Sequence, residues 1–392
     1  MPTQRGWALT GSGLALAWMW YLLGEIELLV AALVLLGAQL FAMALVRACP
    51  SNIALTRFLT STTVNSGDFA TVTLRVSNSS RRAARSLVIT DTVEVLGTAR
   101  FELAKLAGRS SSTASYRVEC HPRGVFHVGP GTVTCRDPFG LAEAVVATGP
   151  IDRIVVYPRV ESLSGFPVVR GQDPAMQASR PEHSRRGGED FYTLREYQRG
   201  DDLRRVHWPY SAKTDELMIR QLETPWQSRA LVLLDVRGDS YETEESFEKA
   251  VAGAATVVTH LVGAGFDADL WAGQADPIDA TRYRAAMERL ALVQTDEVVD
   301  LTAVAGRIRQ SGGGGALVIL TGLADRELLG IRQMLVRDYP TTILMSVSDS
   351  TSQTLLGFQR LGATTITIRT DGAWSPAWAA SLRTTWNAVS VG

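Results

Sequence analysis

Hydrophobic positions along the chain follow three patterns, and each predicts a different kind of element. The first pattern is continuous: Trp7–Leu23 and Ile26–Val46 are apolar runs, and the only formal charges between Trp7 and Val46 are Glu25 and Glu27, close to the break. Each run approaches the roughly 17–25 residues that carry a helix across a bilayer core. We therefore expect residues 1–48 to form a transmembrane helical hairpin.

The basic residues that flank these runs predict their orientation. Arg5 precedes the first run, Arg47 and Arg57 follow the second, and the turn contains no lysine or arginine. The positive-inside rule then places both termini in the cytoplasm and makes the protein multi-pass. A cleaved signal peptide fits poorly, because its apolar core has only about 7–15 residues. Lipidation at Cys49 also fits poorly, because Arg47 would lie within the cleavage site.

The second pattern is alternation of apolar and polar residues, across residues 60–148. "FATVTLRVSN" alternates strictly, "SLVITDTVEV" and "ASYRVEC" have a similar character, and clusters of Gly, Ser, Asn and Arg separate them. Short strands at this spacing predict an antiparallel β-sandwich-like module. Cys120 and Cys135 could pair across a hairpin, but three cysteines in a reducing compartment favour free thiols.

The third pattern occupies residues 226–392. Continuous apolar runs such as "RALVLLDV", "ALVILTG" and "TTILMSVS" alternate with helical stretches. Strands of this kind are buried on both faces of a parallel sheet, and right-handed crossovers give a doubly wound α/β fold. The chain is therefore expected to be multidomain: helical hairpin, β module, then an α/β domain like that of von Willebrand factor A.

Asp235 follows the first strand of the α/β domain, where ligands bind in such folds. The metal loop of a von Willebrand factor A domain reads Asp-x-Ser-x-Ser and offers oxygen ligands to magnesium. Here Arg237 and Asp239 stand in place of the two serines, and the arginine puts a fixed positive charge where the cation would lie. We expect a degenerate loop that binds no metal, with Asp235 pairing with Arg237 or capping the next helix. No cofactor motif is apparent.

Residues 149–225 contain a highly charged stretch, "GGEDFYTLREYQRGDDLRRVHWPYSAK" at 187–213. Nine Lys/Arg and nine Asp/Glu lie between positions 180 and 223, and the whole chain has a net charge of −1. This balance argues against nucleic-acid binding, which requires an excess of cations. Two interpretations remain. In one, His207 is a general base oriented by Asp201 or Asp202 in a hydrolase that Asp235 assists through a metal. In the other, Arg, acidic and aromatic side chains form a clamp or docking surface.

The same stretch closely resembles the signature of the domain of unknown function 58 (DUF58) family. "RGVFHVGPGTVTCRDPFGL" is similar to a second segment of that family, and Lys213 stands where the family usually has arginine. By this resemblance and by their place in the charged stretch, we expect the following residues to bind a partner or to form a structural clamp: Phe191, Arg195, Glu196, Tyr197, Gly200, Asp201, Asp202, Arg204, His207, Trp208, Lys213 and Arg220.

The resemblance implies a bacterial inner-membrane protein. Members are typically encoded beside MoxR-type AAA+ ATPases and often beside transglutaminase-like membrane proteins. It thus implies a non-enzymatic adaptor that works with such an ATPase in the assembly or maturation of a membrane or envelope client. The implied partners are the lipid bilayer, the ATPase and the transglutaminase-like protein.

Overall fold

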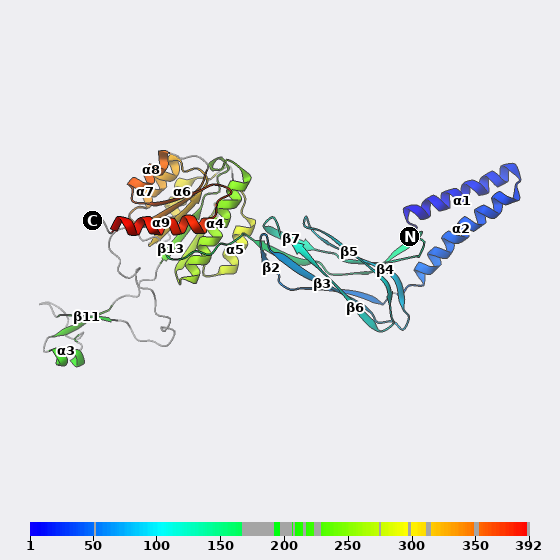
Figure 1. Cartoon of the computed structure of the whole chain (residues 1–392), viewed down its shortest axis with the longest axis horizontal. Coiled ribbons are helices and arrows are strands. Elements are labelled where there is room, and N and C mark those ends of the chain that lie inside the picture. The colour runs from blue at the N-terminus through cyan, green and yellow to red at the C-terminus, as the bar shows by residue number, and fades with distance from the viewer. Residues whose placement is uncertain are drawn as a thin grey trace. The chain divides into compact units, whose positions relative to one another are not determined.

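The computed structural model describes residues 1–50, 52–166, 192–196, 206, 208–214, 217–222, 229–273, 276–296, 299–310, 315–348 and 353–389. The chain divides into two compact units (Figure 1). The first comprises residues 1–159 with 287–292, and the second comprises residues 160–286 with 293–392. Each unit is described by itself.

The first unit begins with a helical hairpin of α1 (Gln4–Leu23) and α2 (Ile26–Arg47), which lie against each other (Figure 1). Gly24 ends α1 with a φ of 77°, a left-handed conformation that glycine adopts without strain, and its N–H donates to the Trp20 carbonyl. Thr3 caps the start of α1 by accepting from the Gly6 N–H at 3.2 Å. Only two residues join the helices, so they must run antiparallel.

Within the described part of the chain, α2 is the one helix that is long and apolar enough to cross a membrane. We expected two membrane-crossing helices, and this finding supports a crossing by α2 only. The helix α1 is less apolar than α2, because it carries Gln4, Arg5 and Thr10 as well as tryptophans with polar ring nitrogens. Both helices nevertheless expose large apolar side chains, among them Trp18 on α1 and Leu33 and Phe41 on α2.

A two-sheet β module follows, antiparallel as the alternating pattern predicts except for the parallel pair of β2 with β10. Its strands are β1 (Ile53–Leu59), β2 (Thr63–Asn65), β3 (Phe69–Asn78), β4 (Ala84–Val93), β5 (Gly97–Leu106), β6 (Ser110–Glu119), β7 (Gly124–Val128), β8 (Thr132–Arg136), β9 (Glu143–Thr148) and β10 (Asp152–Tyr157). One sheet has the order β1-β3-β6. The other has the order β2-β10-β7-β4-β8-β9, with β5 also paired to β4. Leu74 of one sheet and Leu87 of the other meet in a shared core, both fully buried.

Arg57 joins the two sheets through a buried ion pair. Its Nε donates to Asp91 at 3.0 Å, Nη2 contacts the same carboxylate, and Nη1 donates to Asp152 at 2.6 Å. Tyr116 also donates to Asp91 at 2.7 Å. A side chain at Gly129 would meet the Arg57 guanidinium at 2.7 Å, so this glycine leaves room for the ion pair.

All three cysteines are free thiols, and Cys120 and Cys135 lie in separate core clusters. The alternative of a Cys120–Cys135 pair is therefore not realised. The half-buried Cys49 instead packs against the cluster that contains Cys135, and the two thiols interact.

The second unit contains a six-stranded sheet of order β15-β14-β13-β16-β17-β18, parallel except at the β14–β15 edge. The strands are β13 (Arg229–Leu234), β14 (Asp267–Ala272), β15 (Ile278–Asp279), β16 (Ala316–Thr321), β17 (Thr341–Val347) and β18 (Thr364–Ile368). The helices are η3 (Gly238–Ser240), α4 (Glu244–Gly263), α5 (Tyr283–Leu292), α6 (Leu301–Gln310), α7 (Arg326–Leu335), α8 (Gln353–Arg360) and α9 (Trp374–Val389). Only the first four residues of α5 belong to this unit, because residues 287–292 are assigned to the first.

Helices cover both faces of this sheet, as a doubly wound fold requires. Leu231 and Leu233 of β13 pack with residues of α6, α7 and α8, whereas α4 contacts the central strands from its own buried face. Arg332 of α7 is buried in this layer, and its Nε and Nη1 have no hydrogen-bond partner. The chain direction across the sheet reverses between the neighbouring strands β13 and β16.

Part of the charged stretch folds as an antiparallel strand pair, β11 (Tyr192–Glu196) and β12 (Met218–Leu222), with α3 (Trp208–Thr214) between them in sequence. Ser211 of α3 is buried, and its hydroxyl accepts from the Met218 N–H at 2.8 Å. This bond joins α3 to β12.

Candidate functional site at the switch point of the sheet

The candidate site lies where the strand order of the α/β sheet reverses. Asp235 directly follows β13, and Thr321 is the last residue of the adjacent parallel strand β16. Both therefore emerge at the carboxyl edge, which is the usual ligand crevice of doubly wound folds. The Thr321 hydroxyl donates to the Asp235 carboxylate at 3.0 Å, and both side chains are buried.

Arg237 occupies the centre of this crevice. Its Nε and Nη2 donate to the two oxygens of the Asp235 carboxylate at 3.1 and 2.9 Å, a bidentate arrangement that matches the planar fork of the guanidinium. The Arg237 backbone N–H also donates to Asp235, at 3.1 Å. The two side chains retain 7% and 0% of their exposure. The sequence-based prediction that Asp235 pairs with Arg237 is confirmed, whereas Thr243 caps the next helix, α4.

Two further carboxylates reach the same guanidinium from α7. Arg237 Nη1 donates to Asp325 at 2.8 Å and to Glu327 at 3.0 Å. Asp325 is also the N-cap of α7, because its other oxygen accepts from the Leu328 N–H at 2.7 Å. These two carboxylates are 42% and 50% exposed, so the cluster is buried on the Asp235 side and open on the α7 side.

The electrostatics of the cluster keep Arg237 charged. Burial lowers the pKa of Arg237, but hydrogen bonds and charge interactions with Asp235 and Asp325 outweigh burial and raise the pKa above its ordinary value. Tyr241 donates to the Asp235 backbone carbonyl at 2.5 Å. Burial, together with the Asp235 charge, raises the pKa of Tyr241 well above the usual range, so the phenol stays protonated as a donor.

This arrangement leaves a divalent cation little opportunity to bind. Arg237 holds both oxygens of Asp235, and Asp239 is exposed and is not among the carboxylates that contact Arg237. Within the described ranges, no group of three or more His, Cys, Asp or Glu side chains is arranged to hold a metal ion. The geometry instead provides a fixed internal cation bordered by two accessible carboxylates.

Most of the residues predicted from the charged stretch fall outside the described residues: Phe191, Tyr197, Gly200, Asp201, Asp202, Arg204 and His207. The backbones of Arg195 and Glu196 lie in β11, and that of Arg220 lies in β12, where Arg220 pairs with Leu194 and Arg195 with Ile219. Trp208 and Lys213 are exposed on α3.

Glu327 is the member of the cluster that sequence reasoning missed. Thr321 and Asp325 stand in the "LTGLAD" segment that follows the strand, but nothing local links Glu327 to Arg237, which lies 90 positions away. The one available signal was the enrichment of acidic residues in the first turn of a helix.

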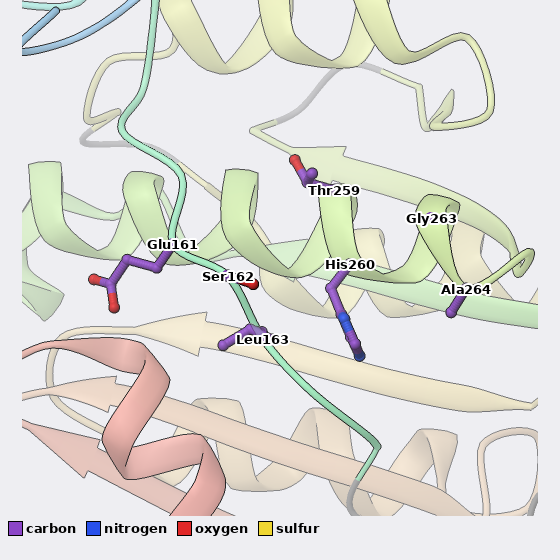
Figure 2. A pocket seen from close by; sticks show the side chains of 7 residues that line it. All are labelled: Glu161, Ser162, Leu163, Thr259, His260, Gly263 and Ala264. Atoms are coloured by element: carbon purple, nitrogen blue, oxygen red, sulfur yellow. The ribbon is translucent and has the colours of Figure 1, made fainter. Parts of the chain in front are cut away.

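The second unit also contains a hollow of about 360 Å³, which lies between residues 161–163 and the C-terminal part of α4 (Figure 2). Its polar groups are already engaged: Glu161 accepts from the Ser375 N–H at 2.9 Å and pairs with Lys249, and His260 contacts the Gly165 carbonyl at 2.7 Å. These bonds hold residues 160–166 against α4 and α9. The Glu161 and His260 side chains of the hollow are therefore used in packing.

Comparison with known proteins supports the resemblance of this chain to the DUF58 family. Residues 193–270, which include Asp235 and Arg237, match the family described as "Protein of unknown function DUF58". The uncharacterized protein YeaD of Bacillus subtilis (strain 168) is 28% identical over 253 residues, which cover 56% of this chain and 62% of the relative. The chain thus spans less than two thirds of that relative's length.

Similarities to solved structures are weak. The CARDB domain of PF1109 from Pyrococcus furiosus is 10% identical and covers 27% of this chain and 94% of that chain, with a TM-score of 0.22. Red sea bream transglutaminase is 12% identical and covers 27% of this chain and 15% of that chain, also with a TM-score of 0.22. Similarities of this size carry no argument about function.

Proposed function

We propose that the protein is a membrane-anchored, non-enzymatic adaptor whose α/β domain presents a metal-independent docking face to a protein partner. The observation that carries the proposal is the Arg237 guanidinium at the switch point, where it takes the place of a bound cation. A site closed in this way has no free ligand position for a reacting water. It keeps, however, a rigid edge with two accessible carboxylates, Asp325 and Glu327.

The likeness to a von Willebrand factor A domain belongs to the same proposal. It is supported by the strand order, by the antiparallel edge strand β15, and by Asp235 and Thr321 at the ends of neighbouring strands. The partner that the family resemblance suggests is a MoxR-type AAA+ ATPase, with a transglutaminase-like membrane protein as a further member of the assembly. The anchor in this proposal is the N-terminal hairpin, with α2 as its most apolar helix.

The direct test is affinity capture of the full chain from its host in detergent, with ATP or a slowly hydrolysed analogue, read by mass spectrometry. We expect an AAA+ ATPase to be captured and the variant Asp325→Ala with Glu327→Ala to lose it. A matched control is Arg369→Ala with Asp371→Ala, an exposed ion pair elsewhere in the same unit. Equal capture by both double variants would remove the docking role of the α7 carboxylates.

The alternative is a metal-assisted hydrolase that uses Asp201, Asp202, His207 and Asp235. The occupied carboxylate of Asp235 weighs against it. A calorimetric titration of the full chain with Mn²⁺ separates the two functions. Stoichiometric binding that Asp235→Ala abolishes would favour the hydrolase.

The membrane orientation needs an introduced reporter. Labelling of Cys120 or Cys135 would fail on either side of the membrane, because both thiols are buried. Val95 lies in the exposed β4–β5 turn, so Val95→Cys provides an accessible thiol. If the β module and the α/β domain are cytoplasmic, a membrane-impermeant maleimide should label this variant only after the cells are opened. Ready labelling of intact cells would contradict that orientation.

A further inference from the structure

The segment Asp137–Ala142, called the wedge below, contacts both helices of the hairpin, near the start of α1 and near the end of α2. Ala142 pairs with Pro2 ahead of α1, and the Thr3 N–H donates to the Leu141 carbonyl at 2.9 Å. A side chain at Gly6 would come within 2.1 Å of that carbonyl, so the glycine permits the close approach. On the other side, Ala142 packs with Ala42 and Val46 of α2, all of them buried.

The wedge lies beside a part of α2 that still exposes apolar side chains. Gln39 approaches the Leu141 carbonyl at 3.5 Å, so the wedge spans the last two turns of α2. Over the same turns, Leu40, Phe41 and Leu45 are exposed. Phe139, at the tip of the wedge, is itself 67% exposed. Exposed apolar side chains thus lie both on this part of the hairpin and on the loop of the β module that packs against it, and apolar patches of this kind mark contact with a partner or a membrane.

Helix length argues that the lipid boundary reaches this loop. The 13 residues of α2 ahead of Gln39 (Ile26–Ala38) extend only about 20 Å, whereas the hydrocarbon core of a bilayer measures about 30 Å. All 22 residues of α2 extend about 33 Å. A bilayer that α2 crosses must therefore cover at least part of the helix that the wedge contacts.

The backbone of the wedge is suited to such a position. Non-helical backbone is tolerated near lipid only where its polar groups are satisfied by protein. Asp137 accepts from the Phe139 N–H at 2.8 Å and from the Ala142 N–H at 2.5 Å. Thr3 donates to the Gly140 carbonyl at 2.7 Å, and Pro138 has no N–H to satisfy.

We propose that the loop Asp137–Ala142 is a membrane-interface element, with Phe139 seated at the boundary between phospholipid headgroups and acyl chains. Phenylalanine, with tryptophan and leucine, is a side chain that interfacial segments bury at this depth. The proposal rests on the membrane anchoring proposed above, and it adds that the β module is held directly on the lipid surface rather than tethered away from it. The occupant of the apolar surface is the phospholipid bilayer.

The test uses the full chain in phospholipid vesicles. A single cysteine carrying an environment-sensitive fluorophore replaces Phe139, in a chain whose native cysteines are alanine. Leu33, 61% exposed on α2, is the deep reference. Phe69, also 61% exposed, is the matched aromatic control, because β3 places it at the end of the strand remote from the pairing with Ile53, which follows the hairpin.

Nitroxide lipids report the depth of each position. Interfacial groups lie roughly 5–10 Å into the boundary, so we expect position 139 to be quenched at least about twofold more by a nitroxide near the headgroup than by one near the chain end. Position 33 should show the reverse, and position 69 neither. Quenching at 33 with none at 139 would overturn this inference and leave the anchor standing. Absence of quenching at both positions would overturn the anchor and the inference together.

A second measurement retains the native cysteines, in case their removal unfolds the β module. A benzophenone side chain at position 139 of the otherwise unaltered protein should form adducts with lipid on illumination, and the same group at position 69 should not. Equal yields of lipid adduct at the two positions would contradict the inference.

Discussion

Breaking the buried ion pair at the switch point is the sharpest test of the site. Arg237→Met keeps a long apolar side chain but removes the guanidinium, so the fully buried Asp235 carboxylate loses its counter-charge and keeps only the Thr321 hydroxyl and one backbone N–H as donors. Removal of one partner from a buried pair costs about 3–5 kcal/mol, because the remaining charge is desolvated without compensation.

The companion variant separates this cost from simple loss of packing. Asp235→Asn with Arg237→Met removes both charges, and Asp325 and Glu327 can then be solvated because each is about half exposed. We expect the double variant to be destabilised by clearly less than the sum of the single variants. The coupling free energy should reach about 2–3 kcal/mol, at the upper end for residues in contact.

Hydrogen exchange of peptides from β13 and β16 in the intact, detergent-solubilised protein measures the effect where it arises. Arg229→Met is the matched control, because Arg229 pairs with Asp267 on the same sheet at 3.4 Å with both side chains about half exposed. Such a pair contributes only about 0–1 kcal/mol. The reasoning is refuted if Arg237→Met is as mild as this control, or if the double variant equals the sum of the singles.

Four further predictions follow from other contacts. Arg237→Ser with Asp239→Ser introduces the Asp-x-Ser-x-Ser pattern and should create a Mn²⁺ site measurable by calorimetry; a variant that binds no better than the parent would mean that the guanidinium does not decide metal binding at this loop. Arg57→Met leaves its buried carboxylate partner unpaired and should destabilise the β module by about 3–5 kcal/mol in chemical denaturation, and a loss under 1 kcal/mol would show that the pair does not join the sheets. Burial raises the pKa of Glu161, but hydrogen bonds from backbone N–H groups and a lysine lower it below its ordinary 4.5, so its stabilisation is present above pH 4.5 and is lost as the pH falls further; Glu161→Gln should abolish this acid-dependent opening of residues 160–166 in hydrogen exchange, and an unchanged pH profile would assign the opening to another group. Arg332→Leu removes a buried, incompletely bonded guanidinium and should leave the melting temperature unchanged or raise it, whereas a drop of several degrees would reveal a partner for that charge.

Local sequence patterns predicted the elements of this fold well. The apolar run before Asp235 is the central strand β13, and the alternating segment that begins at Phe69 is β3. The burial of a strand depends on the polarity of successive residues, so the spacing of apolar residues along the sequence is enough to predict it. The pairing of Asp235 with Arg237 was equally readable, because the two opposite charges lie two positions apart at the end of a buried strand.

Contacts between residues remote in sequence could not be predicted in this way. Asp91 pairs with Arg57, 34 positions away, and the Leu141 carbonyl contacts Gln39, 102 positions away. No periodicity relates such pairs; only the folded chain brings them together. The helix α1 is a different case. The prediction that it crosses the membrane relied on the length of its apolar run, and the polar residues within that run lower its mean hydropathy.

A positive charge that belongs to the polypeptide has a consequence for regulation. A metal-centred site equilibrates with the free ion, so its occupancy follows the ionic composition of the compartment and can be reversed by chelation. The charge of Arg237 is part of the polypeptide, so every chain carries one such charge and it cannot dissociate. In the proposed adaptor, control over binding at this edge must therefore act elsewhere: through the proposed ATPase partner, the nucleotide bound to that partner, or the amount of the protein.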